Sequence, residues 1–287
     1  MTVATALTVK TALADATARL GAAGIPDARR ESRLLVAAAL AWDAARVLGF
    51  PDVEMTPRAR DRLENLIVRR SAHEPISRIL GYREFWSLRF ALSPDTLDPR
   101  PDSETLIEAA LTALGDRDRA YRILDFGTGS GCLLLALLSE LPNAIGTGID
   151  LSDGALVTGR RNAAALGLEG RASFVCGNWG DGVSGQWDII LANPPYIAAD
   201  EVDRLAPEVA QFEPRQALDG GADGLGAYRA LAPAILRLLA PAGVALIEVG
   251  SGQAHKATGI MAAVGLALRA IRHDLSGVDR CLVLGRD

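Results

Sequence analysis

The chain has 287 residues, enough for two domains with separate cores, and its 49% hydrophobic and 23% charged residues are typical of a folded globular protein. The net charge of −5 gives no overall basic field for direct binding of nucleic acid. No apolar run approaches the ~20 residues of a membrane-spanning helix, and the first 20 residues lack the pattern of a signal peptide. We therefore expect a cytoplasmic protein without membrane contact.

Cysteine and histidine usage gives no sign of a metal site. Cys132, Cys176 and Cys281 are scattered in apolar sequence, which favours buried, reduced thiols. No Cys and His residues have the spacing of zinc ligands. We expect a protein without a metal ion.

Residues 1–80 contain only helical signals. Apolar residues recur at helical spacing around Leu35 and Ala38, and again around Leu63 and Ile67. This pattern predicts a small all-helical domain. Its 12 Lys and Arg minus 9 Asp and Glu give +3, which would suit an acidic partner but fits a solvated helical surface equally well.

Residues 81–97 have a different character. The stretch 84–92 is rich in aromatic residues and roughly alternating, which predicts a β-hairpin linker. From residue 98 to residue 287, strand-like and helix-like segments alternate, as in a Rossmann-like, mostly parallel sheet with helices on both faces.

The alternating segments predict a seven-stranded sheet. Its strands are expected at residues 122–126, 144–150, 173–176, 187–192, 243–249, 268–272 and 281–284, and its helices at 132–141, 152–166, 226–239 and 253–264. The connection between the last two strands is too short for a crossover, so these two strands must pair antiparallel at one edge.

A glycine-rich loop follows the first strand of this sheet, at Gly127-Thr128-Gly129-Ser130-Gly131. Glycines let the backbone turn sharply and approach a ligand closely. Cys132 stands where the dinucleotide-binding fingerprint G-x-G-x-x-G has its third glycine, which disfavours a pyrophosphate-binding loop. The sequence also lacks the Gly-Lys-Ser/Thr of a phosphate-binding P-loop. The loop therefore favours an adenosine without a phosphate tail.

Two residues strengthen the interpretation of an adenosine site. Asp150 ends the second strand, where a carboxylate can accept hydrogen bonds from both ribose hydroxyls. It could instead cap the next helix, although Ser152 or Asp153 could fill that position. Trp179 follows the third strand and could pack on an adenine ring or belong to the core. S-adenosylmethionine fits this pattern better than NAD.

The most specific motif is Asn193-Pro194-Pro195-Tyr196, at the carboxyl end of the fourth strand. Ligands bind at this end of the strands in open α/β sheets. A turn that only terminates the strand is the alternative, because prolines remove backbone donors.

This motif suits methyl transfer to a planar nitrogen. An amide nitrogen is a weak nucleophile because its lone pair is delocalised into the carbonyl. The Asn193 side chain and the Pro194 carbonyl could accept its two hydrogens and hold it in line with an activated methyl, while Tyr196 stacks on the amide. Residues 197–223 could shape or close the substrate entrance, with a disordered insertion as the alternative.

Several segments together resemble the release factor glutamine methyltransferase family over nearly the whole chain. Besides the glycine loop and the Asn193 motif, they are Pro75-Ile76-Ser77-Arg78-Ile79-Leu80-Gly81, Arg83-Glu84-Phe85-Trp86, Pro99-Arg100-Pro101-Asp102-Ser103-Glu104 and Phe212-Glu213-Pro214. One departure is Asp98, where the family usually has an apolar residue.

The resemblance implies methylation of N5 of the glutamine in the Gly-Gly-Gln motif of class 1 peptide chain release factors. Residues 127–131, Asp150 and Trp179 would then bind S-adenosylmethionine, and Asn193 would contact both cofactor and substrate. Pro194, Pro195 and Tyr196 would hold the glutamine. The helical domain would bind the release factor, and the enzyme would act as a monomer.

Other activities remain open at the level of sequence. A sister group that methylates a ribosomal protein glutamine shares the motifs, and adenine-N6 methylation of DNA uses the same four-residue motif. DNA binding would need a basic stripe, whereas residues 81–287 carry 18 Lys and Arg minus 26 Asp and Glu, or −8. A catalytically inactive adaptor is disfavoured by the intact glycine loop and Asn193.

Overall fold

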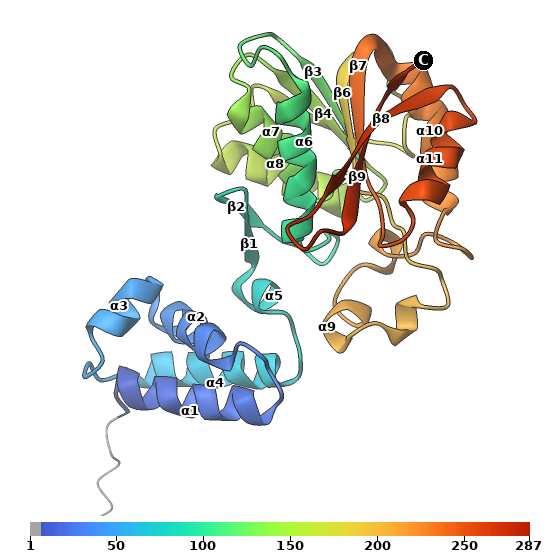
Figure 1. Ribbon diagram of the computed structural model, residues 1–287. Helices are drawn as coiled ribbons and strands as arrows, with labels where there is room; N and C mark the ends of the chain where they lie inside the picture. Colours follow the sequence, from blue (N-terminus) through green and yellow to red (C-terminus); the bar gives the residue numbers. More distant parts are fainter. Residues whose placement is uncertain (1–6) are drawn as a thin grey trace, which may run out of the picture. The chain divides into compact units, whose positions relative to one another are not determined.

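The computed structural model describes residues 7–287, which form two compact units that meet in sequence between Gly81 and Tyr82 (Figure 1). Among these residues, no helix is both long enough and apolar enough to cross a membrane. The first unit is entirely helical except for one isolated bridge, Thr8 to Glu54.

The helical unit begins its helices at favourable capping residues. Its elements are α1 (Val9–Ala22), α2 (Ala28–Leu40), α3 (Ala44–Gly49), α4 (Pro57–Ser71) and α5 (Ile76–Leu80). Side chains of Thr8, Asp43 and Thr56 accept hydrogen bonds from the first turns of α1, α3 and α4. Leu20, Leu35 and other apolar side chains of these helices form one buried core.

One buried ion pair joins two of these helices. Arg70 of α4 donates to Glu31 of α2 over 2.5 Å, and their side chains are 6% and 11% exposed. The pair lies beside an otherwise apolar core, and Arg70 also donates to the Glu74 carbonyl over 3.2 Å, which helps to hold it against Glu31.

The second unit begins with the predicted hairpin, β1 (Tyr82–Phe85) and β2 (Leu88–Ala91), which pair antiparallel. Phe85 and Phe90 are buried in the same apolar cluster as helices of this unit. The Asn162 side chain exchanges hydrogen bonds with both the N–H and the C=O of Ala91. The hairpin is therefore an integral part of the second unit.

The sheet of the second unit confirms the predicted seven-stranded, Rossmann-like fold. Its strands are β3 (Arg122–Phe126), β4 (Ile145–Asp150), β5 (Ala172–Cys176), β6 (Trp187–Ala192), β7 (Leu239–Glu248), β8 (Leu266–His273) and β9 (Asp279–Arg286). Their order is β5-β4-β3-β6-β7-β9-β8, and only β9 runs antiparallel to its neighbours β7 and β8. The antiparallel hairpin at the sheet edge is thus confirmed.

Helices cover both faces of this sheet (Figure 1). Helices α6 (Glu104–Ala113), α7 (Cys132–Glu140) and α8 (Asp153–Ala165) pack with one apolar cluster, and α10 (Gly226–Leu238) and α11 (Ala254–Ala262) with the other. Short elements complete the unit: η1 (Pro101–Ser103), η2 (Val202–Arg204), α9 (Pro207–Ala210) and η3 (Arg215–Ala217).

Two features of the fold differ from the sequence-based expectation. Helix α6 was not predicted, although its buried Leu106, Ile107 and Ala110 have helical spacing. Strand β7 starts at Leu239 and not at residue 243, since β-pairing extends to Trp187 across a register shift. The extension of β7 depends on tertiary pairing with β6, whereas α6 was missed although its local pattern is helical.

Candidate active site

The two loops of interest emerge side by side from the centre of the sheet. Strands β3 and β6 are parallel neighbours, with Asp125 opposite Leu191 and Phe126 opposite Ala192. The glycine loop continues directly from β3, and the Asn193 motif continues directly from β6. This is where the strand order reverses direction, the usual ligand position in such sheets.

A cavity of about 490 Å³ lies at this point. Of the residues predicted for the site, Gly127, Thr128, Gly129, Ser130, Asp150, Trp179, Asn193 and Pro195 line it. Gly131, Pro194 and Tyr196 do not belong to its lining. The other lining residues come from the segment after the hairpin, from Ser103, from the start of α7, from the loops after β4 and β5 and from residues 214–230.

The glycine loop has a conformation that side chains disfavour. Gly127, Gly129 and Gly131 have φ values of 66°, 55° and 79°. Thr128 fixes the loop from within, because its hydroxyl donates to Asp125 over 2.6 Å and its N–H donates to the Ile149 carbonyl. The loop thus presents backbone to the cavity.

Asp125 is a buried carboxyl beneath this loop. It is 1% exposed, and burial raises its pKa to about 7, with the Thr128 hydrogen bond acting in the opposite direction. The sequence did not single out this residue, although an acidic residue at the end of a core strand is an unusual choice. Its contacts make it a support for the loop.

Asp150 is held in place by backbone donors. One carboxylate oxygen accepts from the Gly129 N–H over 2.8 Å and the other from the Ser152 N–H over 2.9 Å. Burial raises its pKa, and these hydrogen bonds oppose the shift. Ser152 caps α8 through its own hydroxyl, so the capping alternative for Asp150 is unnecessary.

The remaining capacity of Asp150 fits an adenosine. A carboxylate has about four acceptor positions, and the two backbone donors occupy two of them. The carboxylate also lines the cavity beside glycines without side chains. A neutral pair of ribose hydroxyls therefore suits this position, whereas a phosphate would meet negative charge.

Trp179 borders the same cavity from the loop after β5. Its φ is 51°, in the left-handed region that is uncommon for residues other than glycine. A side-chain carbon at Gly127 would lie 3.9 Å from the Trp179 ring. The ring is also partly buried against the second apolar cluster. Trp179 therefore both lines the cavity and packs on the core, and its packing on an adenine ring stays a prediction.

Asn193 is oriented by a hydrogen bond that the sequence did not reveal. Its amide nitrogen donates to the Ser103 hydroxyl over 3.2 Å. Ser103 in turn donates to Glu248 at the end of β7 over 2.5 Å. The bond uses an amide hydrogen of Asn193 and leaves its carbonyl oxygen available as an acceptor at the cavity.

Glu248 also anchors the other end of the motif. The Tyr196 hydroxyl donates to it over 3.3 Å, and the Gln253 side chain donates to the Tyr196 carbonyl over 2.8 Å. Burial, followed by the Glu248 charge, raises the pKa of Tyr196. These contacts fix the hydroxyl and the backbone of Tyr196, and stacking of its ring on a substrate amide stays a prediction.

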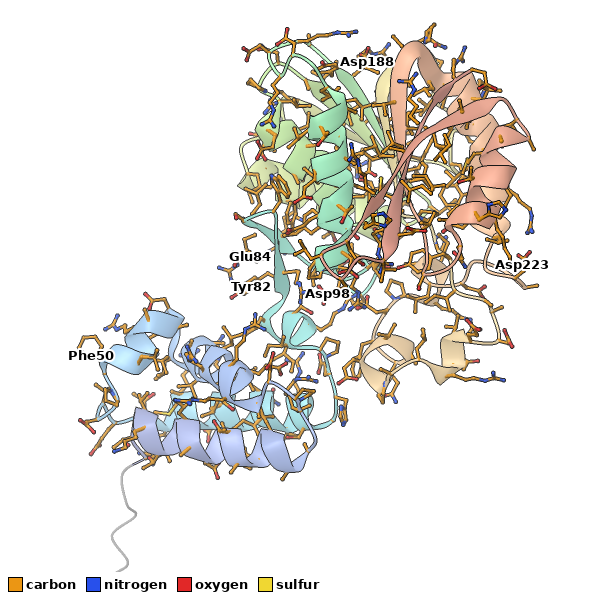
Figure 2. All side chains as sticks on the ribbon, viewed as in Figure 1. Phe50, Tyr82, Glu84, Asp98, Asp188 and Asp223 are labelled. Atoms are coloured by element: carbon orange, nitrogen blue, oxygen red, sulfur yellow. The ribbon has the colours of Figure 1, made fainter. Side chains whose placement is uncertain are left out.

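The segment after the motif is ordered by specific contacts. Ile197 forms a bridge with Asp219, and the buried Glu213 accepts from the Asp98 N–H over 3.1 Å and from Arg100 over 3.4 Å. Asp98, labelled in Figure 2, also pairs with Arg83 over 3.7 Å. Asp98, the acidic departure from the family pattern, thus has a charged partner. Residues 197–223 are ordered by the contacts of Ile197 and Glu213, so the alternative of a disordered insertion is wrong.

The role of Glu104 is structural. Its carboxylate accepts from the Trp86 N–H over 2.7 Å, which fixes the turn of the hairpin. Arg100, in the same family-like segment as Glu104, contacts Glu213 in the segment that borders the cavity.

Comparison with known protein families divides the chain in a similar way. The model described as PrmC N-terminal domain matches residues 11–81, and the model described as Methyltransferase small domain matches residues 85–219. Two solved structures share the fold at a TM-score of 0.50. They are a ribosomal protein L11 methylase from Lactobacillus delbrueckii subsp. bulgaricus (19% identical, 68% of this chain and 84% of that chain) and a methyltransferase from Pyrococcus furiosus (16%, 69% and 88%).

Curated relatives extend over most of the chain. A release factor glutamine methyltransferase from Rhodospirillum rubrum is 51% identical over 93% of this chain and 82% of that protein. One from Cereibacter sphaeroides is 46% identical over 94% and 95%, and one from Moorella thermoacetica is 38% identical over 98% and 99%. The chain therefore belongs to the release factor glutamine methyltransferase family and is an S-adenosylmethionine-dependent methyltransferase.

Proposed function

We propose that this protein methylates N5 of the glutamine in the Gly-Gly-Gln motif of class 1 peptide chain release factors. The observation that carries the proposal is the placement of Asn193 at the cavity, beside the glycine loop, with its amide nitrogen bound to Ser103. The names and the high identity of the relatives support the choice of substrate.

In this proposal the cofactor site consists of the residues predicted from sequence. Glycines 127, 129 and 131 with Thr128 and Ser130 would approach the cofactor through backbone, and Asp150 would accept from the ribose hydroxyls. Trp179 would cover the adenine, and Asn193 would lie between cofactor and substrate. The support is that all of these except Gly131 line one cavity. When bound, the cofactor supplies a methyl group on a sulfonium leaving group.

The residues of the motif act on the glutamine by orientation. The Asn193 carbonyl oxygen and the Pro194 carbonyl would accept the two amide hydrogens, which directs the nitrogen lone pair toward the methyl. Pro195 would contact the side chain at the cavity wall, and Tyr196 would complete the pocket. The nitrogen would form its bond to the methyl carbon as the carbon–sulfur bond breaks, and one of the two amide hydrogens would leave as a proton to solvent. Because the leaving group drives the reaction, no strong base is required, and alignment and exclusion of water from the reacting atoms provide most of the rate.

For the helical domain, residues 1–80, we propose binding of the release factor. Support comes from its match to the family's N-terminal domain and from exposed apolar side chains on its surface, Leu48, Phe50 and Val53, which are 56%, 54% and 40% exposed. Figure 2 labels Phe50 on this unit. We assign residues 81–97 as a hairpin linker that packs within the second unit, and residues 98–287 as the methyltransferase domain. We propose a monomeric, cytoplasmic enzyme without direct nucleic acid contact.

The test is transfer of a labelled methyl group to purified, unmethylated release factor. We expect a mass gain of one methyl on the peptide that contains Gly-Gly-Gln, and none on a release factor whose glutamine is replaced by glutamate. Ribosomal proteins and DNA are assayed in parallel. Label on one of these, with none on the release factor, would replace the proposed substrate.

A further inference from the structure

Three side chains beneath the cavity form a hydrogen-bonded chain that joins separate segments of the fold. Asn193 follows β6, Ser103 ends η1, and Glu248 ends β7. The Asn193 amide nitrogen donates to Ser103 over 3.2 Å, and Ser103 donates to Glu248 over 2.5 Å. Ser103 and Glu248 are 2% and 1% exposed, so water does not compete for these bonds.

The direction of these bonds is fixed by chemistry. An ionised carboxylate only accepts, so the single hydroxyl hydrogen of Ser103 must be given to Glu248. The Ser103 oxygen can then only accept from Asn193, which turns the amide nitrogen of Asn193 toward Ser103. The carbonyl oxygen of Asn193 must face the other way.

We propose that Ser103 and Glu248 are positioning residues that hold the Asn193 carboxamide with its oxygen toward the reacting nitrogen. This inference rests on the proposed function, since that orientation matters because the substrate amide is a donor. A reversed carboxamide would present N–H to N–H and would repel the substrate. Without these hydrogen bonds, the shape of the carboxamide would not favour either of its two orientations, because its oxygen and nitrogen are nearly equal in size.

Neighbouring groups partly stabilise the ionised form of the buried Glu248 carboxylate. The positive charge of Arg280 of β9 favours the ionised form of Glu248, and Arg280 also pairs with Asp102 over 3.3 Å and Asp274 over 3.0 Å. Tyr196 donates to the second carboxylate oxygen over 3.3 Å. Asp102 opposes ionisation, and burial dominates, so the pKa of Glu248 rises to about 7.

Protonation of Glu248 removes the constraint on the chain. A neutral carboxyl can donate to the Ser103 oxygen, which frees the Ser103 hydroxyl to donate to the carbonyl oxygen of Asn193. The carboxamide would then turn its nitrogen toward the substrate. Methyl transfer at saturating substrate and cofactor should therefore weaken on the acidic side of the Glu248 titration.

The first test separates positioning from folding. We expect Ser103→Ala to lower kcat by about 10–100-fold, since loss of alignment is expensive for transfer, with KM for the cofactor within about 2-fold. Ser103→Thr keeps the hydroxyl and should recover most of kcat. Ser139→Ala is the matched control, because Ser139 donates only to Ala136 of its own helix.

The second test is the pH profile of kcat. The wild-type rate should fall below about pH 7, whereas Glu248→Gln, which cannot ionise, should lose this acidic limb and run at a uniformly reduced rate. Asp125, which is buried beneath the glycine loop, also has a pKa near 7. It supports the cofactor loop, so its titration should change the KM for the cofactor and not kcat.

A third measurement does not depend on the substrate. With asparagine labelled by ¹⁵N, the side-chain NH₂ signals of Asn193, identified by their loss in Asn193→Ala, should show one slowly exchanging hydrogen that moves to a free position in Ser103→Ala. If the wild type shows this signal but does not methylate release factor, the proposed function fails and the positioning stands. An unchanged Asn193 signal, or an unchanged kcat in Ser103→Ala, would overturn the positioning inference. A kcat in Ser103→Thr no better than in Ser103→Ala would do the same.

Discussion

The buried Glu31 of the helical unit and the buried Glu248 of the methyltransferase unit have different partners. Glu31 in the helical unit receives a direct ion pair from Arg70 at 2.5 Å. Glu248 in the methyltransferase unit accepts from two neutral hydroxyls, those of Ser103 and Tyr196. Glu31 thus joins two helices, whereas Glu248 orients polar groups next to a cavity.

This difference separates stability from function. A buried charge with a close counter-ion serves to hold elements together, and its partner cannot be removed without a large loss. Buried carboxyls without a close counter-ion have raised pKa values, as in Glu248 and Asp125, each at about 7. Such groups cluster at functional sites because chemistry there requires them.

Removal of the counter-ion in the helical unit should have the largest effect on stability. We expect Arg70→Met to lower the free energy of unfolding of this unit by about 3–5 kcal/mol, because Glu31 is left buried without its partner. The double variant Glu31→Leu with Arg70→Met should recover most of the loss. Hydrogen exchange of the full chain can follow each unit separately.

An exposed pair of the same unit is the matched control. Arg19 contacts Glu64 over 2.6 Å, but their side chains are 36% and 58% exposed. Arg19→Met should therefore cost less than about 1 kcal/mol. Equal losses in Arg19→Met and Arg70→Met, or no recovery in the double variant, would contradict the distinction between the two glutamates.

Substitution of Asn193 should have the largest effect on catalysis. We expect Asn193→Ala to lower kcat by about 10²–10³-fold, as for loss of other preorganised catalytic hydrogen-bonding groups, while cofactor binding by calorimetry stays measurable. Asn193→Asp keeps an acceptor oxygen but cannot donate to Ser103, so its kcat should lie between those of the wild type and Asn193→Ala. Turnover of Asn193→Ala at the wild-type rate would refute the role of the motif.

A smaller effect is expected from Asp150, which acts on the cofactor. Loss of a charge-assisted contact in Asp150→Ala should weaken cofactor binding by about 1.5–3 kcal/mol, with kcat at saturating cofactor nearly retained. Asp153→Ala, an exposed acidic residue in the first turn of α8, is the control and should bind normally. Equal affinities for wild type and Asp150→Ala would exclude the ribose contact.

The sequence was informative wherever a function depends on local pattern. The glycine loop and the Asn193 motif follow directly from strands, so their place at the carboxyl edge was predictable from alternation of elements alone. Ser103 and Glu248 were missed because they are 145 residues apart in the chain. Only the pairing of β6 with β7 and the packing of η1 bring them under Asn193.

The same contrast applies to residues of unassigned role. Glu104 lies in a segment that resembles the family, yet its bond to the Trp86 backbone depends on how the hairpin folds back. Tyr196 was identified from its motif, but the bond from its hydroxyl to the buried Glu248 could not be predicted from the motif. Side-chain direction depends on tertiary partners, which single-sequence patterns do not contain.

A different kind of effect, on the pH dependence of stability, is expected from the buried Asp125. Its pKa is about 7 in the folded protein and about 4 in an unfolded chain. Its stabilising contribution is therefore complete below pH ~4 and is lost as pH rises through ~7. Asp125→Asn keeps an acceptor for Thr128 and cannot ionise, so the Tm of this variant relative to the wild type should be higher at pH 8 than at pH 4.

The opposite sign is expected at an exposed carboxylate, which makes a stringent control for Asp125. Ion pairing with Arg229 at 2.5 Å lowers the pKa of Asp223, labelled at the surface in Figure 2, to about 2. Its contribution is present above pH ~4 and is lost as pH falls toward ~2. Asp223→Asn should therefore slightly lower Tm at pH 8. If both variants shift Tm in the same direction with pH, burial is not what separates these two carboxylates.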